Sequence, residues 1–234
     1  MRVGTTVLLK EGFCYQSYGW DILRPLGSLK HVLKFLDNYE VDEICIVRVN
    51  RDSDSFEKFK RDVDLVRGSI SNSPLSFGGG IRSQKYLGLL DGLPIERIHF
   101  SSAFIKKQNQ LISSAKDRFG SQAVVASLPI RINLGKLEVF NSSENKFQTL
   151  TNSILEFIKS NADEILIIDC IHEGETERFD FEIIEHLDFP TDRIIISGGI
   201  GVSTINHASS KGYASCLIEN RVLHKENYFV RELS

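Results

Sequence analysis

Two glycine-rich segments of the sequence have the composition of an anion-binding turn. Residues 77–83 read Phe-Gly-Gly-Gly-Ile-Arg-Ser, and residues 197–201 read Ser-Gly-Gly-Ile-Gly. Each follows a short apolar run and precedes a helix-like segment, so its backbone N–H groups can surround a phosphate. Glycines at such places also serve simply to make a tight turn. Two matching turns favour an elongated ligand with a phosphate at each end and a chain built from duplicated halves.

Four charged residues form a second pattern, because each stands at the start of a short apolar run. They are Arg2, Glu43, Arg97 and Glu164. If these runs are strands of one barrel, the four side chains point inward and meet near the axis as a ring of alternating charge. The simplest interpretation of such a ring is a plug of stabilising salt bridges at the bottom of the barrel.

Eight short apolar runs must position these residues. The segments between the runs have apolar residues at helical spacing, for example Phe56, Phe59, Val63 and Val66. This alternation is typical of a parallel sheet, and eight units in this length predict one α/β domain over 1–234, a (β/α)8 TIM barrel. The insertion 132–146 predicts a hairpin after the fifth strand, with 136–140 as one arm and a position on the C-terminal face. The predicted strands cover 3–9, 43–49, 75–77, 97–100, 123–128, 164–169, 193–197 and 215–218.

Composition excludes several classes of function. With 234 residues, 25% of them charged, and a net charge of -3, the chain lacks the basic excess that nucleic acids or anionic membranes attract. No apolar run is long enough for a membrane span and no signal peptide is recognisable, which predicts a cytoplasmic protein. The four scattered cysteines predict buried free thiols, and no histidine pair has metal-ligand spacing. We expect neither a metal nor a cofactor.

Several segments together resemble the cyclase subunit of imidazole glycerol phosphate synthase, a HisF-like family of histidine biosynthesis. They are 77–83, 119–125, 164–166, 172–174 with 179–180, and 197–199. The resemblance extends over nearly the whole chain and keeps the order and spacing of the strands. It implies a barrel whose top face binds a bisphosphorylated aminoimidazole precursor. It also implies a HisH-like class I glutaminase subunit, docked on the bottom, that supplies ammonia through the core.

The sequence departs from this family at the positions that do its chemistry. The family's two catalytic aspartates, which act as general acid and base, correspond to Leu8 and Pro129, and neither side chain can move a proton. A third acidic position corresponds to Arg48, and a family lysine to Gln16. The top-face residues Lys10 and Glu173 are kept.

The phosphate sites implied by the resemblance are also altered. Glu219 stands beside the second one, where the family has a small residue, and a carboxylate repels a phosphate unless a cation such as Arg221 pairs with it. The candidate phosphate-binding residues are Gly79, Gly80, Ser101, Ser102, Gly174, Ser197, Gly198, Gly199 and Asn220.

In the family the charged ring is an ammonia gate, and Arg97 replaces its lysine. Charged side chains are expensive to desolvate, yet this chain keeps all four of them although the catalytic aspartates are missing. This combination favours a chain that still conducts ammonia. The Leu-Leu-Lys motif at Leu8 is similar to glycosyl amidation-associated paralogues from surface-polysaccharide loci. That similarity implies ammonia delivery to a sugar, with a third amidotransferase protein carrying the acceptor chemistry. The alternatives are a true cyclase of histidine biosynthesis and a non-catalytic scaffold that activates a glutaminase.

Overall fold

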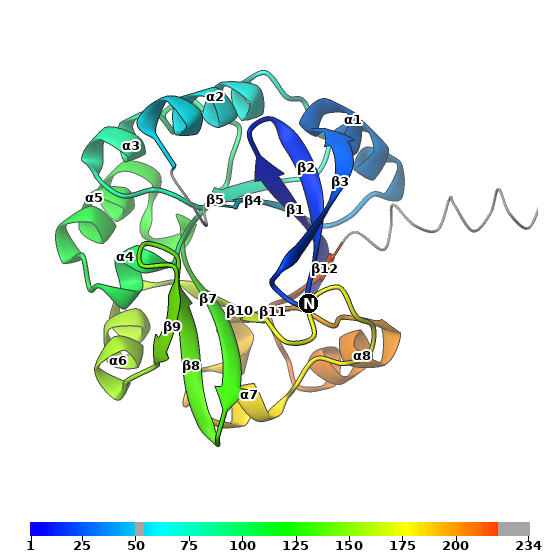
Figure 1. The fold of residues 1–234 in the computed structure, drawn as a ribbon, viewed down its shortest axis with the longest axis vertical. Coiled ribbons are helices and arrows are strands. Elements are labelled where there is room, and N and C mark those ends of the chain that lie inside the picture. The colour runs from blue at the N-terminus through cyan, green and yellow to red at the C-terminus, as the bar shows by residue number, and fades with distance from the viewer. Residues whose placement is uncertain (50–53, 220–234) are drawn as a thin grey trace, which may run out of the picture.

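The computed structural model describes residues 1–49 and 54–219, and eight parallel strands among them close into a barrel (Figure 1). Each strand pairs with the next, and the last pairs with the first, where Ser215 lies opposite Arg2. The predicted (β/α)8 barrel is confirmed. Its strands are β1 (Arg2–Lys10), β4 (Ile44–Arg48), β5 (Leu75–Gly78), β6 (Arg97–Phe100), β7 (Val124–Asn133), β10 (Glu164–Asp169), β11 (Ile194–Ser197) and β12 (Ser215–Glu219).

Helices surround this barrel as an outer layer (Figure 1). The predicted spacing of helix α2 is confirmed: Phe59, Val63 and Val66 are buried, and the Ser55 hydroxyl caps its first turn by accepting from the Lys58 N–H. Within the described ranges, none of the helices combines the length and apolar character needed to cross a membrane. The helices are α1 (Leu29–Leu36), α2 (Phe56–Arg67), α3 (Gln84–Gly88), α4 (Ser102–Ile105), α5 (Asn109–Phe119), α6 (Asn152–Asn161), α7 (Glu182–Glu185) and α8 (Val202–Ser210), with 3₁₀ turns η1 (Asp37–Tyr39), η2 (Ser121–Ala123) and η3 (Thr191–Arg193).

The side chains of the barrel strands alternate between two cores. Ile44 and Ile46 face outward into the large core shared with the helices, while Cys45 faces the barrel interior. The inner core is small and consists of Cys45, Val125, Leu166, Ile168, Ile195 and Leu217. All four cysteines are free and buried, as predicted. Burial raises the pKa of Cys14, Cys45 and Cys216 to about 12, so these thiols stay protonated at neutral pH.

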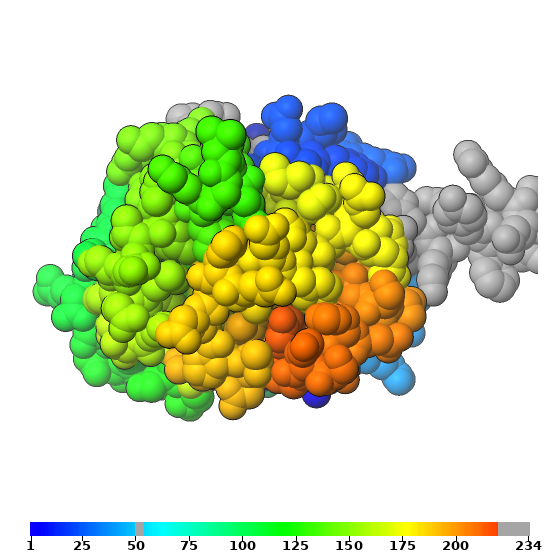
Figure 2. Space-filling model, turned by 90° about the horizontal axis from the view of Figure 1, so that it is seen from below, coloured from blue at the N-terminus to red at the C-terminus, as the bar shows by residue number. Residues whose placement is uncertain are grey.

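Two antiparallel excursions rise from the C-terminal face of the barrel. The predicted hairpin is confirmed as β8 (Lys136–Asn141), which pairs with an extended β7 and with β9 (Lys146–Thr149). The second excursion is not among the predicted strands, and it consists of β2 (Phe13–Tyr18) and β3 (Ile22–Ser28). The end of β1 continues past the barrel and pairs with β2, for example Leu8 with Tyr15. In Figure 2 both excursions and the loop 170–181 lie along the same end of the molecule.

The two glycine turns adopt the same backbone geometry in the two halves of the barrel. Gly79, after β5, and Gly198, after β11, both have a φ of +91°. A side chain on Gly79 would meet the Arg48 carbonyl oxygen at 2.3 Å, and one on Gly198 would meet the Asp169 carbonyl oxygen at 2.4 Å. These glycines are therefore required by the close approach of the preceding strand, and their equivalence supports a duplicated origin.

We predict that Gly198→Ala destabilises the fold by about 2–4 kcal/mol, because it combines backbone strain with a clash against the main chain. Gly88→Ala is the matched control. Its new methyl group would meet only the end of the Arg118 side chain, at 3.8 Å. We expect it to be neutral or slightly stabilising. Urea unfolding followed by circular dichroism measures both changes, and equal stability of the two variants would contradict the assignment.

Candidate functional site

A pocket that is open at its mouth lies at the C-terminal end of the barrel. Most of its wall is apolar, with Val47, Phe140 and Ile168 among its lining residues. Trp20, from the β2–β3 turn, meets Phe140 of β8 edge to face, with ring centroids 5.7 Å apart. The two excursions thus contact each other over the pocket, and the predicted position of the insertion on this face is confirmed.

Leu8 and Pro129, which the resemblance aligns with the family's catalytic positions, both line this pocket. Leu8 lies near the end of β1, and Pro129 lies on β7 opposite Ile168 of β10. Their presence makes this part of the pocket apolar. The structure thus gives both positions a packing role, with no proton to donate or accept.

Arg48 also lines the pocket, but two carboxylates neutralise it. Its Nε lies 2.8 Å from Asp62 Oδ2, and its Nη2 lies 3.0 Å from Asp54 Oδ1. All three side chains are buried, and Nη1 also donates to the Gly79 carbonyl oxygen at 3.4 Å. Arg48 therefore fixes the Gly79 turn against α2. The sequence analysis missed the two aspartates, although Asp62 stands on the buried face of α2.

The floor of the pocket holds a neutral histidine. His99 Nδ1 lies 3.0 Å from the Ser127 hydroxyl, and Nε2 lies 3.0 Å from the Ser76 hydroxyl and 3.5 Å from the Cys45 sulfur. Burial, reinforced by the charge of Arg97, lowers the pKa of His99 to about 3. His99 is therefore a hydrogen-bonded interior residue, uncharged at neutral pH.

Glu173 holds the β2–β3 excursion against the loop after β10. Its Oε2 accepts from the Ser17 hydroxyl at 2.6 Å and from the Trp20 N–H at 3.1 Å. Glu173 is buried and lines the pocket. Lys10, the other retained top-face residue, is exposed at the end of β1 and is not among the residues that line this pocket.

The first candidate phosphate site opens on this pocket. Gly79 and Ser101 line it, and Gly80 and Ser102 stand next to them in the chain. The Ser101 hydroxyl is buried, and no other group in the described part of the chain forms a hydrogen bond with it. This half of the barrel thus offers a hydroxyl to a ligand.

The second candidate site is occupied by a side chain of the protein itself. The Gly174 N–H donates to Glu219 Oε2, and the Ser197 hydroxyl lies 3.5 Å from Glu219 Oε1. Burial, followed by the charge of Glu173, raises the pKa of Glu219 well above its usual value. Gly198 and Gly199 form the neighbouring turn, while Asn220 lies outside the described residues.

A second carboxylate takes the N-terminal donors of the adjacent helix α8. Glu177 Oε2 accepts from the Thr204 N–H at 3.1 Å, and Oε1 accepts from the Ser203 N–H at 3.2 Å. These bonds, led by one from the Ser203 hydroxyl, lower the pKa of Glu177 to about 2. The sequence analysis missed this cap, although Glu177 lies within the loop that carries the family resemblance.

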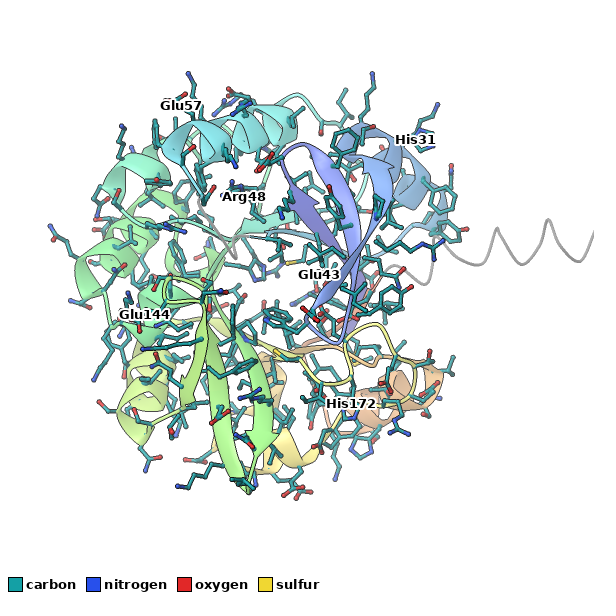
Figure 3. The ribbon with its side chains drawn as sticks, in the orientation of Figure 1. His31, Glu43, Arg48, Glu57, Glu144 and His172 are labelled. Atoms are coloured by element: carbon teal, nitrogen blue, oxygen red, sulfur yellow. The ribbon has the colours of Figure 1, made fainter. Side chains whose placement is uncertain are left out.

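The four charged residues at the strand starts form a closed ring at the opposite end of the barrel. Arg2 lies 3.2 Å from Glu43 and 2.7 Å from Glu164, and Arg97 lies 3.5 Å from Glu43 and 3.1 Å from Glu164. Both carboxylates are buried, and Figure 3 labels Glu43 near the barrel axis. Burial alone would lower the pKa of Arg2, but the hydrogen bond to Glu164 and the charges of both carboxylates outweigh it and raise the pKa.

The family model described as histidine biosynthesis protein matches residues 14–228 of this chain. The chain belongs to this family. A Campylobacter jejuni protein, provisionally named imidazole glycerol phosphate synthase subunit hisF2, is 26% identical over 88% of this chain and 84% of its own length. The HisF subunits of Chlorobaculum parvum and Exiguobacterium are 26% and 25% identical, each over 96% of this chain and 90% and 88% of theirs.

As a member of the histidine biosynthesis family, the chain is a divergent HisF-like protein. Its barrel has the ring at the bottom and the glycine turns at the top, where Leu8 and Pro129 line the pocket. Within the described residues, no group of three or more histidine, cysteine, aspartate or glutamate side chains is arranged to hold a metal ion.

The two carboxylates of the second site predict opposite dependences of stability on pH. Because the pKa of Glu219 is raised in the folded state, its contribution is complete below the unfolded pKa near 4.5 and is lost as the pH rises above it. Because the pKa of Glu177 is lowered in the folded state, the contribution of Glu177 to stability is present above the unfolded pKa and is lost as the pH falls toward 2. We expect Glu219→Gln to gain stability relative to the wild type between pH 5 and 8.

We expect Glu177→Gln to lose stability over the same range, and to approach the wild type near pH 2.5. Urea unfolding at several pH values measures the difference in unfolding free energy for each variant. The same change at Glu57, which is exposed on α2, is the control for the loss of a surface charge. Parallel pH profiles for the two variants would contradict the assigned contacts.

Proposed function

We propose that this barrel is the synthase subunit of a glutamine-dependent complex. A glutaminase docks on the face that holds the charged ring, glutamine hydrolysis releases glutamate and ammonia, and the ammonia crosses the barrel to the top-face pocket. The acceptor is a molecule other than the imidazole precursor, and the reaction is an amidation in the synthesis of a surface-polysaccharide sugar. The names of the relatives as subunits of a synthase support a partnered role.

The observation that carries this proposal is the closed ring. Each of the four side chains contacts two of opposite charge, although removing charged groups from water is expensive. Arg2 and Arg97 keep partial exposure at the barrel mouth, with 31% and 22% of their side-chain surface accessible. The Arg97–Glu43 contact is the longest of the four, at 3.5 Å.

The interior above the ring suits a small neutral molecule. Cys45, Val125 and Leu166 make it largely apolar, which disfavours ammonium and favours ammonia. His99, with its lowered pKa, adds a neutral hydrogen-bonding group between the ring and the pocket. This arrangement supports a path from the bottom of the barrel to the pocket floor.

The top face supports an altered acceptor. Leu8 and Pro129 remove the proton-transfer groups of the cyclase reaction, so amidation requires its acid and base elsewhere. A third protein, a sugar amidotransferase, supplies them in this proposal. The Leu-Leu-Lys motif that contains Leu8 supports the same assignment through its similarity to glycosyl amidation-associated paralogues.

Breaking the ring should uncouple glutamine hydrolysis from ammonia delivery. We expect Arg2→Ala to lower the ratio of amidated product to glutamate severalfold in the complete complex, because Glu43 and Glu164 lose a partner and the ring no longer excludes water. The variant should also lose about 3–5 kcal/mol of stability. Arg97→Lys, which keeps the charge, is the matched control and should retain the wild-type ratio.

Melting curves must show that Arg2→Ala is folded before its ratio is interpreted. A folded Arg2→Ala protein with the wild-type ratio would make the ring a structural plug. Sedimentation without association between barrel and glutaminase at micromolar concentrations would overturn the partnership itself. Association with stimulated glutaminase activity but no ammonia transfer to any acceptor would favour the scaffold alternative.

The isolated barrel should not cyclise the imidazole precursor. With both acid–base positions lost, we expect the ammonium-dependent rate to fall by at least about 10²–10⁴-fold relative to a HisF subunit. A HisF subunit from a relative, assayed in parallel, is the positive control. Complementation of a histidine auxotroph by this chain would instead establish the cyclase alternative.

A further inference from the structure

Strand register makes Ser101 and Glu219 equivalent positions in the two halves of the barrel. Gly78 pairs with His99 in the first half, and Ser197 pairs with Leu217 in the second. Gly78 and Ser197 each precede the glycine with a φ of +91°. Ser101 and Glu219 each follow two residues after their paired position, so they occupy the same place beside the two glycine turns.

The two equivalent positions have opposite chemistry. The buried Ser101 hydroxyl lines the pocket and has no hydrogen-bond partner among the described residues. Glu219 brings a carboxylate to its turn and accepts the Gly174 N–H there. One half of the barrel therefore keeps a donor available for an anion, and the other half has already used a donor on its own carboxyl group.

Other N–H donors of the second half are likewise bound by carboxylates of the protein. Glu177 accepts the N–H groups of Ser203 and Thr204 at the start of the nine-residue helix α8. A side chain on Gly201 would meet Glu177 at 2.3 Å, so the glutamate is packed against the turn. Asp169, the equivalent of Arg48, has its carboxylate engaged by His172 at 2.7 Å and by the Asp180 N–H at 2.9 Å.

We propose that the barrel binds its ligand through a single anionic group, held by the first half at Gly79, Gly80, Ser101 and Ser102, and that Glu219 and Glu177 close the second half to anions. The body of the ligand is uncharged and lies against the apolar wall formed by Leu8, Val47 and Pro129. This inference rests on the proposed function only in taking the pocket as the acceptor site. It names the substrate class as a molecule with one anionic group, such as a monophosphate ester.

Electrostatics favours this orientation over the reverse. An anion in the second half would lie near the carboxylates of Glu173 and Asp169, whose charges already act on Glu219. Like charges at short range repel strongly where water is excluded. In the first half, Arg48 lines the pocket and pairs with Asp54 and Asp62.

A pair of matched probes tests the proposal on the isolated barrel. The probes are n-pentyl phosphate and pentane-1,5-diyl bisphosphate, with binding measured by isothermal titration calorimetry. We expect the wild type to bind the monophosphate at least tenfold more tightly than the bisphosphate. Tighter binding of the bisphosphate, or no binding of either probe, would overturn the inference.

Reciprocal variants assign the difference to the two equivalent positions. Ser101→Glu copies the second half into the first and should abolish binding of n-pentyl phosphate, while Ser101→Ala should weaken it severalfold. Glu219→Ser copies the first half into the second and should reduce the preference for the monophosphate. Glu57→Ser removes a carboxylate from the outer face of α2, where Figure 3 labels it, and should leave both affinities within twofold of the wild type.

Melting curves check that each variant is folded, and Ser101→Ala keeps the test decisive if Ser101→Glu does not fold. Unchanged affinities in both Ser101→Ala and Glu219→Ser would overturn the inference. The glutaminase takes no part in these titrations. Failure here therefore leaves the ammonia-delivery proposal standing, and loss of glutaminase association leaves the anion assignment standing.

Discussion

The barrel interior is built around four charged side chains that pair with one another, and the Ser215 hydroxyl also donates to Glu43. Arg2 and Arg97 each contact both Glu43 and Glu164. Loss of any one member therefore removes one ion-pair partner from each of two others. The four residues come from strands that are far apart in the sequence, and they meet only if every strand begins at the same level. The ring thus fixes the N-terminal end of the barrel and, through strand register, the height at which the glycine turns and the pocket lie above it.

Much of this architecture could be predicted because it follows from local patterns. Runs such as Ile165 to Ile168 are apolar on both faces, which is typical of strands enclosed by helices, and each ring member stands at or next to the start of a strand. The β2–β3 excursion could not be predicted in this way, because β3 contains Arg24 and Pro25 and is mostly exposed. The pairing of Arg48 with Asp54 and Asp62, and the caps by Glu177 and Glu219, depend on which loops meet in space, and no spacing in the sequence encodes that.

The two halves of the barrel share a backbone frame and differ in what it holds. Gly79 and Gly198 turn the chain in the same way against Arg48 and Asp169, yet the first of these strand-end residues is a cation bound to a helix and the second an anion bound within its own loop. A duplicated frame leaves each half free to change its side chains as long as the glycines remain. Family membership and departure from the family's ligand chemistry are therefore compatible in one chain.

Trp20, which contacts Phe140, gives the pocket a tryptophan fluorescence signal that the rest of the molecule lacks. The sequence contains a single tryptophan, and its indole lines the pocket beside the ring of Phe140. Emission excited at long ultraviolet wavelengths therefore originates at this one location. Separation of the two excursions, or displacement of water by a bound molecule, changes the surroundings of that indole and so changes the spectrum of the unlabelled protein.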